Sequence, residues 1–519
     1  MHPNKKLLFT NINFTVNAID KIALIGNNGT GKSTLLKIIV GELQYSEGRL
    51  KTVSTPYYVP QIFGQYNHLT IAQALRIDKK LNALTNILKG DTSEENFNML
   101  NDDWTIEDRC KEALNYWQLK DLDLSLPMKS LSGGQKTKVF LAGISIHQPE
   151  FILLDEPSNH LDTSGRQLLY NFIQTTKSTL IVVSHDRKLL NLLDNVCELS
   201  RNGIKVYGGN YDFYKQQKQI ENNTLSQDIQ SKEKTLRKAK EKERETIERQ
   251  QKQNSRGKNQ QKKEGTPKAM RDKMKNDAEK STSKLKNIHA EKIGGISHNL
   301  KELRSLLPDI GKMKFGFDNS ALHKGKILVT ATNINFKYDK IQLWENNLNF
   351  QITSGERIAL KGQNGSGKTT IIKLILGTFK SKSGTIYRAE NKSVYIDQDY
   401  SLLDNTLNVY QQTQQFNSSA LQEHEIKIRL NRFLFTKDDW EKSVKVLSGG
   451  ERMRLMICCL TISNQSPDII ILDEPTNNLD IQNIEILTAA INEYQGTLIV
   501  VSHDETFLKQ VKIERTIRL

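Results

Sequence analysis

Short apolar runs near both ends of the chain predict buried β-strands. KIALI at 21–25 and FILL at 151–154 lie in the first half, and RIAL at 357–360 and IIIL at 469–472 lie in the second. Runs of this length, bounded by polar residues, are typical of strands in the core of an α/β fold. The longest of them are far below the roughly 20 apolar residues that cross a bilayer, so the sequence predicts no membrane span.

The same motifs occur twice in the same order, which indicates an internal repeat. GNNGTGKST at 26–34 recurs as GQNGSGKTT at 362–370, an offset of 336 residues, whereas LSGG recurs with an offset of 316. The first copy therefore holds 20 extra residues, somewhere between 61 and 130. We interpret about 62–130 as containing an inserted, arm-like segment that contacts a partner, although its apolar periodicity could equally belong to the helical layer of the repeat itself.

Between the copies, residues 215–314 contain no Phe, Trp or Tyr, so this segment cannot build a conventional core. It is rich in strong helix formers, and the absence of Pro and Gly predicts a helix over about 211–253. Breakers cluster at Gly257, Gly265 and Pro267, after which a second helix is expected over about 268–293. The domain organisation that follows is a first repeat at 1–214, a helical-hairpin linker at 215–325 and a second repeat at 326–519.

Charge is concentrated in the linker. The chain carries a net charge of +15. Residues 215–325 hold 28 Lys and Arg against 15 Asp and Glu, and 249–275 around the expected tip hold 10 against 2. A solvated charge run is the alternative, but a bias concentrated at the tip favours contact with a phosphate backbone.

Each glycine-rich loop follows a predicted strand and precedes a predicted helix, which is the setting of a phosphate-binding loop. Backbone N–H groups and the positive helix end favour phosphate, Lys32 and Lys368 reach the β- and γ-phosphate oxygens, and the Ser33 and Thr369 hydroxyls are suited to hold Mg²⁺. The residues predicted to surround the phosphates are Gly26, Asn28, Gly29, Gly31, Lys32, Ser33, Thr34, Gly362, Asn364, Gly365, Gly367, Lys368, Thr369 and Thr370.

Paired carboxylates end one strand of each repeat, at the sheet edge next to the phosphate loop. Because strand side chains alternate in direction, one acid of each pair can serve the metal and the other the attacking water. We predict Asp155 and Asp473 as metal partners and Glu156 and Glu474 as the catalytic acids. His185 and His503 each end a VVSH strand and are predicted to reach the γ-phosphate.

Two LSGG segments can offer a hydroxyl, backbone N–H groups and a helix N-terminus to a phosphate. The residues predicted to bind phosphate there are Ser132, Gly133, Gly134, Ser448, Gly449 and Gly450.

The four cysteines, Cys110, Cys197, Cys458 and Cys459, have no metal or disulfide spacing, which indicates buried thiols in a reducing compartment.

Taken in order, these motifs resemble the ATP-binding cassette superfamily, twice over and across nearly the whole chain. The resemblance implies two P-loop ATPase cassettes of α/β fold, joined by the linker, that bind ATP and Mg²⁺ and pair head to tail within one monomer. It further implies that Gln61 and Gln398 sense metal and water, that Asp162 and Asp480 belong to D-loops, and that both sites are competent for hydrolysis.

More narrowly, two cassettes with a basic helical linker and an insertion in the first resemble the ABC-F subfamily, which are ribosome-bound translation factors or antibiotic-resistance proteins. This resemblance implies binding near the ribosomal exit site in the ATP-bound closed state, a linker that reaches toward P-site tRNA and the peptidyl-transferase centre, and release on hydrolysis in the cytoplasm. The RNA-contacting residues we expect are Lys258, Lys262, Lys263, Lys268 and Arg271.

One departure from the family concerns adenine. Tyr338 ends the strand ILVTATNINFKY and matches the family's adenine-stacking aromatic, but the equivalent position in the first repeat is His2 and the preceding strand is missing. Either the start of the sequence is set too late, which we favour, or the first site stacks adenine poorly.

Two other functions fit the motifs less well. The ATPase subunit of a membrane transporter whose membrane domain is a separate chain would have a short, ordinary linker. An ATPase acting on DNA would carry a zinc-bearing or very long coiled-coil insertion inside a cassette.

Overall fold

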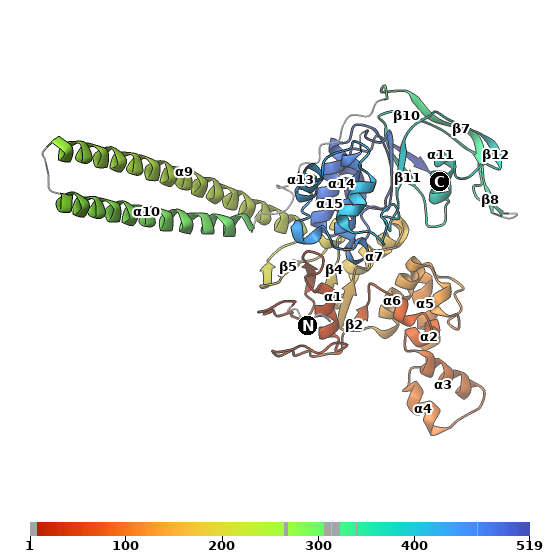
Figure 1. The fold of residues 1–519 in the computed structure, drawn as a ribbon. Helices are drawn as coiled ribbons and strands as arrows, with labels where there is room; N and C mark the ends of the chain where they lie inside the picture. Colours follow the sequence, from red (N-terminus) through yellow and green to blue (C-terminus); the bar gives the residue numbers. More distant parts are fainter. Residues whose placement is uncertain (1–7, 264–267, 306–312, 314–321, 339–340, 464) are drawn as a thin grey trace. The chain divides into compact units, whose positions relative to one another are not determined.

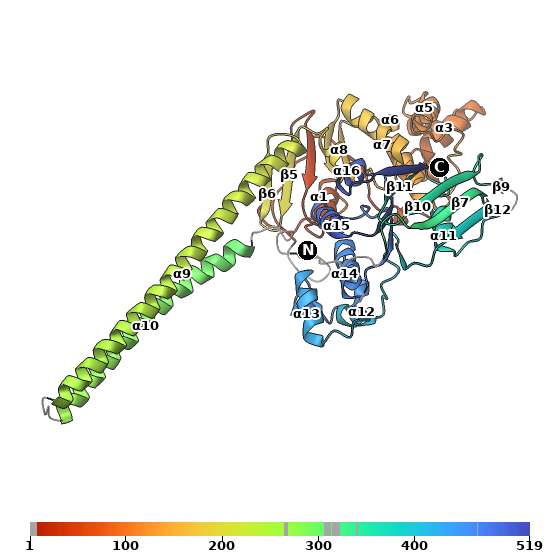
Figure 2. The same ribbon diagram turned by 90° about the horizontal axis from the view of Figure 1, so that it is seen from above.

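The computed structural model describes residues 8–263, 268–305, 313, 322–338, 341–463 and 465–519. The chain divides into two compact units, one formed by Lys215–Lys312 and the other by Met1–Tyr214 together with Met313–Leu519. The first and second repeats thus share one unit, whereas the linker forms the other. Figures 1 and 2 show the ribbon in two views.

The first repeat is built on a six-stranded sheet in the order β2-β3-β4-β1-β5-β6. Its strands pair in parallel except for the last two, which form an antiparallel hairpin. In β1, Ala23 and Ile25 enter one core cluster while Ile22 and Leu24 enter the other, because alternate side chains point to opposite faces. The strands are β1 (Lys21–Ile25), β2 (Tyr57–Val59), β3 (Phe151–Asp155), β4 (Thr179–Val183), β5 (Asn195–Ser200) and β6 (Gly203–Tyr207).

Eight helices of the first repeat lie within its described residues and pack on the sheet or on one another. The fully buried Trp117 lies in the larger core cluster, directly after the helix Ile106–Tyr116 of the predicted insertion region. The helices are α1 (Lys32–Ile39), α2 (Ile71–Ala74), α3 (Asp78–Leu88), α4 (Glu94–Leu100), α5 (Ile106–Tyr116), α6 (Gly133–His147), α7 (Thr163–Thr175) and α8 (Arg187–Leu190).

The 20 extra residues of the first repeat coincide with α3 and α4. Applying the offset of 336 brings α2 to the start of α12 (Val409–Gln415) in the second repeat, and the offset of 316 brings α5 onto α13 (Glu423–Arg432). The two helices between them therefore have no counterpart. Figure 1 shows them as a short helical pair beyond α2. Asp103 joins this region together, since its carboxylate binds Lys80 at 2.8 Å and Arg109 at 2.7 Å.

The second repeat has a five-stranded parallel sheet in the order β13-β14-β15-β11-β16. Its parallel strands are β11 (Arg357–Lys361), β13 (Ser393–Ile396), β14 (Ile469–Asp473), β15 (Thr497–Val501) and β16 (Arg515–Arg518). Its helices are α11 (Lys368–Leu376), α12 (Val409–Gln415), α13 (Glu423–Arg432), α14 (Gly449–Ile462), α15 (Ile481–Glu493) and α16 (Glu505–Gln510).

An antiparallel sheet distinguishes the second repeat from the first. Its central strand β7 (Ile327–Asn335) pairs with both β10 (Leu348–Thr353) and β12 (Ser383–Arg388), and β8 (Lys337–Tyr338) pairs with β9 (Ile341–Gln342). In the first repeat, positions equivalent to β10 and β12 fall in the described segments 8–20 and 41–56, which form no strand. His2 lies outside the described residues.

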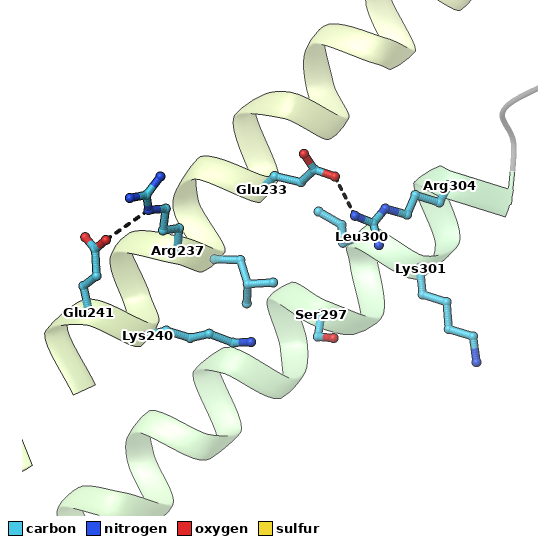
Figure 3. A pocket seen from close by; sticks show the side chains of 9 residues that line it. Glu233, Arg237, Lys240, Glu241, Ser297, Leu300, Lys301 and Arg304 are labelled. Atoms are coloured by element: carbon cyan, nitrogen blue, oxygen red, sulfur yellow. Dashed lines mark hydrogen bonds and ion pairs between the residues drawn. The ribbon is translucent and has the colours of Figure 1, made fainter. Parts of the chain in front are cut away.

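The linker consists of α9 (Tyr211–Lys263) and α10 (Lys268–Ser305), which run side by side in opposite directions in both views (Figures 1 and 2). Near the end of α10, the Arg304 guanidinium bonds to the carboxylate of Glu233, which lies within α9, at 2.5 Å across the two helices. Figure 3 shows this pair beside a cavity of about 580 Å³ that Leu300 also lines. Mixed charges rather than a continuous apolar stripe therefore line this part of the helix pair.

Both linker helices are longer than predicted. Gly257 lies inside α9 instead of ending it, and α10 continues past Ile293 through Gly294 and Gly295. A glycine costs a helix only about 1 kcal/mol relative to alanine, which long flanking runs of helix formers and a partner helix offset. The predicted tip residues Gly265 and Pro267 lie outside the described residues.

No helix in the described part of the chain is long and apolar enough to cross a membrane. All four cysteines are free and buried.

Candidate nucleotide site

Each glycine-rich loop ends in a glycine whose backbone conformation other residues rarely adopt. Gly31 and Gly367 precede α1 and α11 with φ of 96° and 92°, in the left-handed region. A Cβ on Gly26 would lie 2.4 Å from the Leu199 carbonyl oxygen, so the backbone at the start of the first loop must stay bare. Both loops consequently present backbone N–H groups at a helix N-terminus, the arrangement that binds phosphate.

Each loop lysine folds back over its own loop. Lys32 Nζ donates to the carbonyl oxygens of Gly26 at 2.6 Å and Asn27 at 3.3 Å, and Lys368 Nζ donates to those of Gly362 at 2.8 Å and Gln363 at 3.1 Å. Burial lowers the pKa of Lys32, while the nearby carboxylates of Glu156, Asp480 and Asp155 oppose that shift. The ammonium thus sits where anionic phosphate oxygens would be its natural partners.

The predicted metal carboxylates end β3 and β14. Asp155 is 1% exposed; its Oδ2 accepts from the Tyr58 hydroxyl at 3.1 Å, and Ser33 bonds to the same carboxylate. Its Oδ1 is buried without a hydrogen-bond partner among the described residues. In the second repeat, Asp473 Oδ2 accepts from the Tyr395 hydroxyl at 2.8 Å.

An unpartnered carboxylate oxygen beside a hydroxyl is a donor set that fits Mg²⁺, a hard cation that prefers oxygen ligands and keeps several waters. Ser33 and Asp155 would hold the ion in the first repeat, and Thr369 and Asp473 in the second. Bound there, the ion would neutralise charge on the β- and γ-phosphates. Gln61 and Gln398 follow β2 and β13 at the same sheet edge, with intermediate exposure.

Each predicted catalytic glutamate faces its predicted histidine. His185 Nε2 lies 3.2 Å from Glu156 Oε1, and His503 Nε2 lies 3.4 Å from Glu474 Oε1. Both glutamates occupy the left-handed region, with φ of 52° and 48°. A bulky residue held at positive φ stores strain, a feature that clusters at functional sites.

Burial sets the protonation of these groups. It raises the pKa of Glu156 to about 8 and that of Glu474 to about 7, against the opposing charges of Lys32 and of Arg166 and Lys368. Burial lowers the pKa of His503 to about 4 and that of His185 well below its ordinary value. The histidines are therefore neutral near pH 7, and the glutamates titrate in the range suited to proton transfer with water.

The LSGG serines begin α6 and α14 as N-caps. The Ser132 hydroxyl accepts from the Gln135 N–H at 3.3 Å, and the Ser448 hydroxyl accepts from the Glu451 N–H, also at 3.3 Å. The glycines that follow keep the helix starts clear. A Cβ on Gly450 would lie 2.2 Å from Asn483 Nδ2, and one on Gly134 would lie 2.7 Å from the His160 carbonyl oxygen. Gly133 and Gly449 stand first in these helices.

Contacts between the repeats join the loop of one to the D-loop of the other. The Asn28 N–H donates to Asp480 Oδ2 at 2.8 Å, and Asn364 Nδ2 donates to the His160 carbonyl oxygen at 3.1 Å. A Cβ on Gly134 would lie 3.6 Å from Asn364 Nδ2, which brings the first LSGG helix next to the second phosphate loop. We call Lys32, Glu156 and His185 the first site, and Lys368, Glu474 and His503 the second site.

Tyr338 and the predicted RNA-contacting residues take no part in the contacts between the repeats described above. Tyr338 is 51% exposed and its hydroxyl lies 3.0 Å from the Thr370 hydroxyl, so it stands beside the second phosphate loop. The predicted RNA-contacting residues fall in α9 and α10, but their side chains lie outside the described residues; they are Lys258, Lys262, Lys263, Lys268 and Arg271.

Sequence reasoning missed four residues of the sites. Tyr58 and Tyr395 hold the metal carboxylates, and each stands three residues before the predicted glutamine, a shared spacing that could have identified them. Thr163 and Arg166 approach the second site from the first repeat. No sequence signal identifies them, because their role depends on how the two repeats face one another.

A family model described as ABC transporter matches residues 9–159 and 345–477. Among curated proteins, the putative ATP-binding protein YdiF of Bacillus subtilis is 32% identical over 530 residues, covering 97% of this chain and 76% of that protein. The probable ATP-binding protein YbiT of Escherichia coli O157:H7 is 30% identical, covering 98% and 93%. The ATP-binding protein Uup of Escherichia coli K12 is 29% identical, covering 98% and 78%.

Among solved structures, the RNase-L inhibitor is similar with a TM-score of 0.59 at 19% identity, covering 97% of this chain and 84% of that one. A model of ribosome-bound archaeal Pelota and ABCE1 is similar with a TM-score of 0.57 at 19% identity, covering 97% and 73%. These likenesses concern the fold.

Two α/β repeats, each with a phosphate loop, an LSGG helix and a paired carboxylate, define the class of tandem nucleotide-binding ATPases. The chain belongs to the ATP-binding cassette family, and its relatives make it an ATPase of the ABC-F kind. The resemblance, the fold class and the enzyme class drawn from the sequence are thus confirmed.

Proposed function

We propose that the ATP-bound, closed form of this chain binds the ribosome near the exit site, that the linker reaches toward P-site tRNA and the peptidyl-transferase centre, and that hydrolysis releases the complex. The chain would act in the cytoplasm as a translation factor or as an antibiotic-resistance protein of the ribosome. The observation that carries the proposal is the linker, a pair of long helices without an aromatic core and with a net charge of +13 over 215–325.

The charge of the linker fits a polyanionic partner. Electrostatic contact with phosphates supplies much of the affinity of proteins for nucleic acid. The excess is greatest over 249–275, where α9 ends and α10 begins. Two similar solved structures are a complex of archaeal ABCE1 with a ribosomal stalk protein and a model of ribosome-bound Pelota and ABCE1, which supports the same class of partner here.

Closure is the step that we assign to ATP. In each site, residues of both repeats lie beside the phosphate loop, so a nucleotide can favour the closed form only through its greater affinity for that form. During hydrolysis a water oxygen bonds to the γ-phosphorus, the bond to the β–γ bridging oxygen breaks, and the proton of the water moves to Glu156 or Glu474.

The α3–α4 pair of the predicted insertion carries a second candidate contact surface. The α3–α4 pair exposes Phe97 and Met99, and Trp104 follows it, with exposed fractions of 41%, 40% and 47%. Exposed aromatic side chains of this kind are enriched at protein interfaces. We assign this segment to partner contact on the ribosome.

Cosedimentation tests the proposal. Glu156→Gln with Glu474→Gln should trap the closed form, because an amide cannot accept the proton of the attacking water. We expect this double variant in the ribosomal pellet with ATP and not with ADP.

The linker requires its own control. Gln at Lys258, Lys262, Lys263, Lys268 and Arg271 should remove the double variant from the pellet. Gln at the same number of exposed basic residues elsewhere on α9 should not; these are Lys232, Lys234, Lys238, Lys240 and Lys242. Normal ATP binding without ribosome binding would refute the proposal and direct the search to a membrane partner.

A further inference from the structure

The N-terminus of α7 faces the second site, and its two key side chains have no polar counterpart in the other repeat. Thr163 Oγ1 lies 3.2 Å from His503 Nδ1, a contact between the two repeats. The segment LDTSGR at 161–166 corresponds to LDIQNI at 479–484, so Ile481 stands where Thr163 stands and Ile484 where Arg166 stands. The two sites therefore receive different side chains from the opposite repeat.

Arg166 adds charge to the same region. It is 8% exposed, its Nε donates to the Leu161 carbonyl oxygen at 3.2 Å, and its Nη1 lies 3.8 Å from Asp186 Oδ2. These contacts fix the guanidinium inside the unit. Its positive charge is the strongest influence that opposes the burial-driven rise in the pKa of Glu474. An arginine of the first repeat thus acts on the acid of the second site.

The first site lacks these contacts. His185 Nδ1 is buried and has no hydrogen-bond partner among the described residues. Ile481 is partly buried and packs against the apolar core of the first repeat. Ile484 is buried, 2% exposed. His185 Nε2 lies 3.2 Å from Glu156 Oε1, an oxygen without a hydrogen-bond partner among the described residues, so the ring lacks a bond like the one that Thr163 makes to His503.

The two ring nitrogens of a histidine do not act independently of one another. In a neutral histidine one ring nitrogen is a donor and the other an acceptor, and the bond made by one nitrogen fixes the role and direction of the other. A hydroxyl at Nδ1 therefore sets how Nε2 meets the carboxylate and the phosphate. The hydroxyl of Thr163 provides that bond for His503, and an isoleucine cannot provide it for His185.

We propose that Thr163 is a positioning residue that acts across the repeats, orienting His503 so that the second site hydrolyses ATP faster than the first. The full set of motifs in both sites is thus compatible with unequal turnover.

Single-site variants test the inference. Glu156→Gln leaves the second site able to hydrolyse, and Glu474→Gln leaves the first. We expect the chain with Glu156→Gln to retain most of the ATPase rate and the chain with Glu474→Gln to lose most of it. Equal residual rates would overturn the inference.

The decisive substitution is Thr163→Val in the Glu156→Gln background, since valine keeps the shape and removes the hydroxyl. We expect kcat to fall about tenfold with the KM for ATP nearly unchanged, and Thr163→Ser to restore the rate. Thr175→Val, at the other end of α7, is the matched control and should change neither parameter. A loss that serine does not rescue would mean that Thr163 only packs.

If either glutamine alone silences both sites, the same three substitutions are compared in the chain with both glutamates intact. Thr163→Val must then lower kcat while Thr163→Ser and Thr175→Val do not. An unchanged kcat for Thr163→Val would overturn the inference in that background too.

Discussion

At the scale of single residues, the two catalytic glutamates combine burial with a strained backbone. Glu156 is 6% exposed at φ 52°, and its pKa is raised to about 8. Few side chains tolerate this conformation, so the surrounding structure must hold it in place. The Glu156 N–H donates to the Val183 carbonyl oxygen at 2.8 Å, and the Glu474 N–H does the same with Val501. Strand β4 or β15 thus anchors the turn that carries each acid.

Gly143 in α6 provides a sharp test of packing at this scale. A Cβ there would lie 1.9 Å from the Tyr57 hydroxyl and 2.9 Å from Leu75 Cδ2. Gly→Ala inside a helix normally stabilises by about 1 kcal/mol. Here we expect Gly143→Ala to lower the free energy of unfolding by about 2 kcal/mol, since overpacking a core costs 1–3 kcal/mol.

Chemical denaturation measures this change, and a double-variant cycle assigns its cause. Tyr57→Phe removes the hydroxyl that bonds to the Phe140 carbonyl oxygen at 3.0 Å. Combined with Gly143→Ala it should be less harmful than the two single effects added together. Additive effects would show that the clash lies elsewhere.

Motif spacing singled out Lys32, Asp155 and Glu156, which lie within one repeat and which the structure brings close together. Their roles in the site stay predictions. Thr163 was not predicted, because its partner is 340 positions away and belongs to the other repeat. Local pattern carries no information about such a contact.

At the scale of elements, short apolar runs predicted strands, and helix-forming composition without Pro or Gly predicted both linker helices. The ends of these helices were predicted less well. The rule that glycine ends a helix failed at Gly257 and again at Gly294 and Gly295, which lie within α9 and α10. Propensity is a small free energy per residue, and a long helix with a packed partner overrides it.

Unlike Gly143, Gly294 and Gly295 leave room for a side chain. A Cβ on either meets no atom within 4 Å, and φ is not positive at either residue. We expect Gly294→Ala and Gly295→Ala each to stabilise α10 by about 1 kcal/mol. Hydrogen exchange of the amides around 290–300 in the full chain should slow accordingly. Faster exchange would mean that the glycines serve a close contact in another state of the linker.

The antiparallel sheet shows how an element depends on its neighbours. Residues 12–17 of the first repeat correspond to β10 yet form no strand. Ile12, Phe14 and Val16 are partly buried against the core cluster that holds Leu24. Their apolar character suits a strand, yet the described segment 8–20 packs against the core as an irregular segment.

At the scale of the whole molecule, the sequence predicted two cassettes and a linker, and the likeness to known proteins supported that organisation. Head-to-tail pairing came from the family resemblance rather than from the composition. Contacts such as Asn28 with Asp480 agree with that arrangement within the unit formed by both repeats. The linker forms a unit of its own, for which we propose a ribosomal partner.

We propose that each ATP is held by residues of both repeats, Lys32 with Ser448 and Lys368 with Ser132, as the head-to-tail pairing implied by the family resemblance requires. The most direct measurement is the number of ATP molecules retained by the chain with Glu156→Gln and Glu474→Gln after rapid removal of free nucleotide. We predict two per chain, falling to one when Ser448→Arg is added, because the arginine would block the first site from the opposite repeat. Ser463→Arg, beyond the other end of α14, is the matched control and should leave two. Two ATP molecules retained with Ser448→Arg would contradict the account.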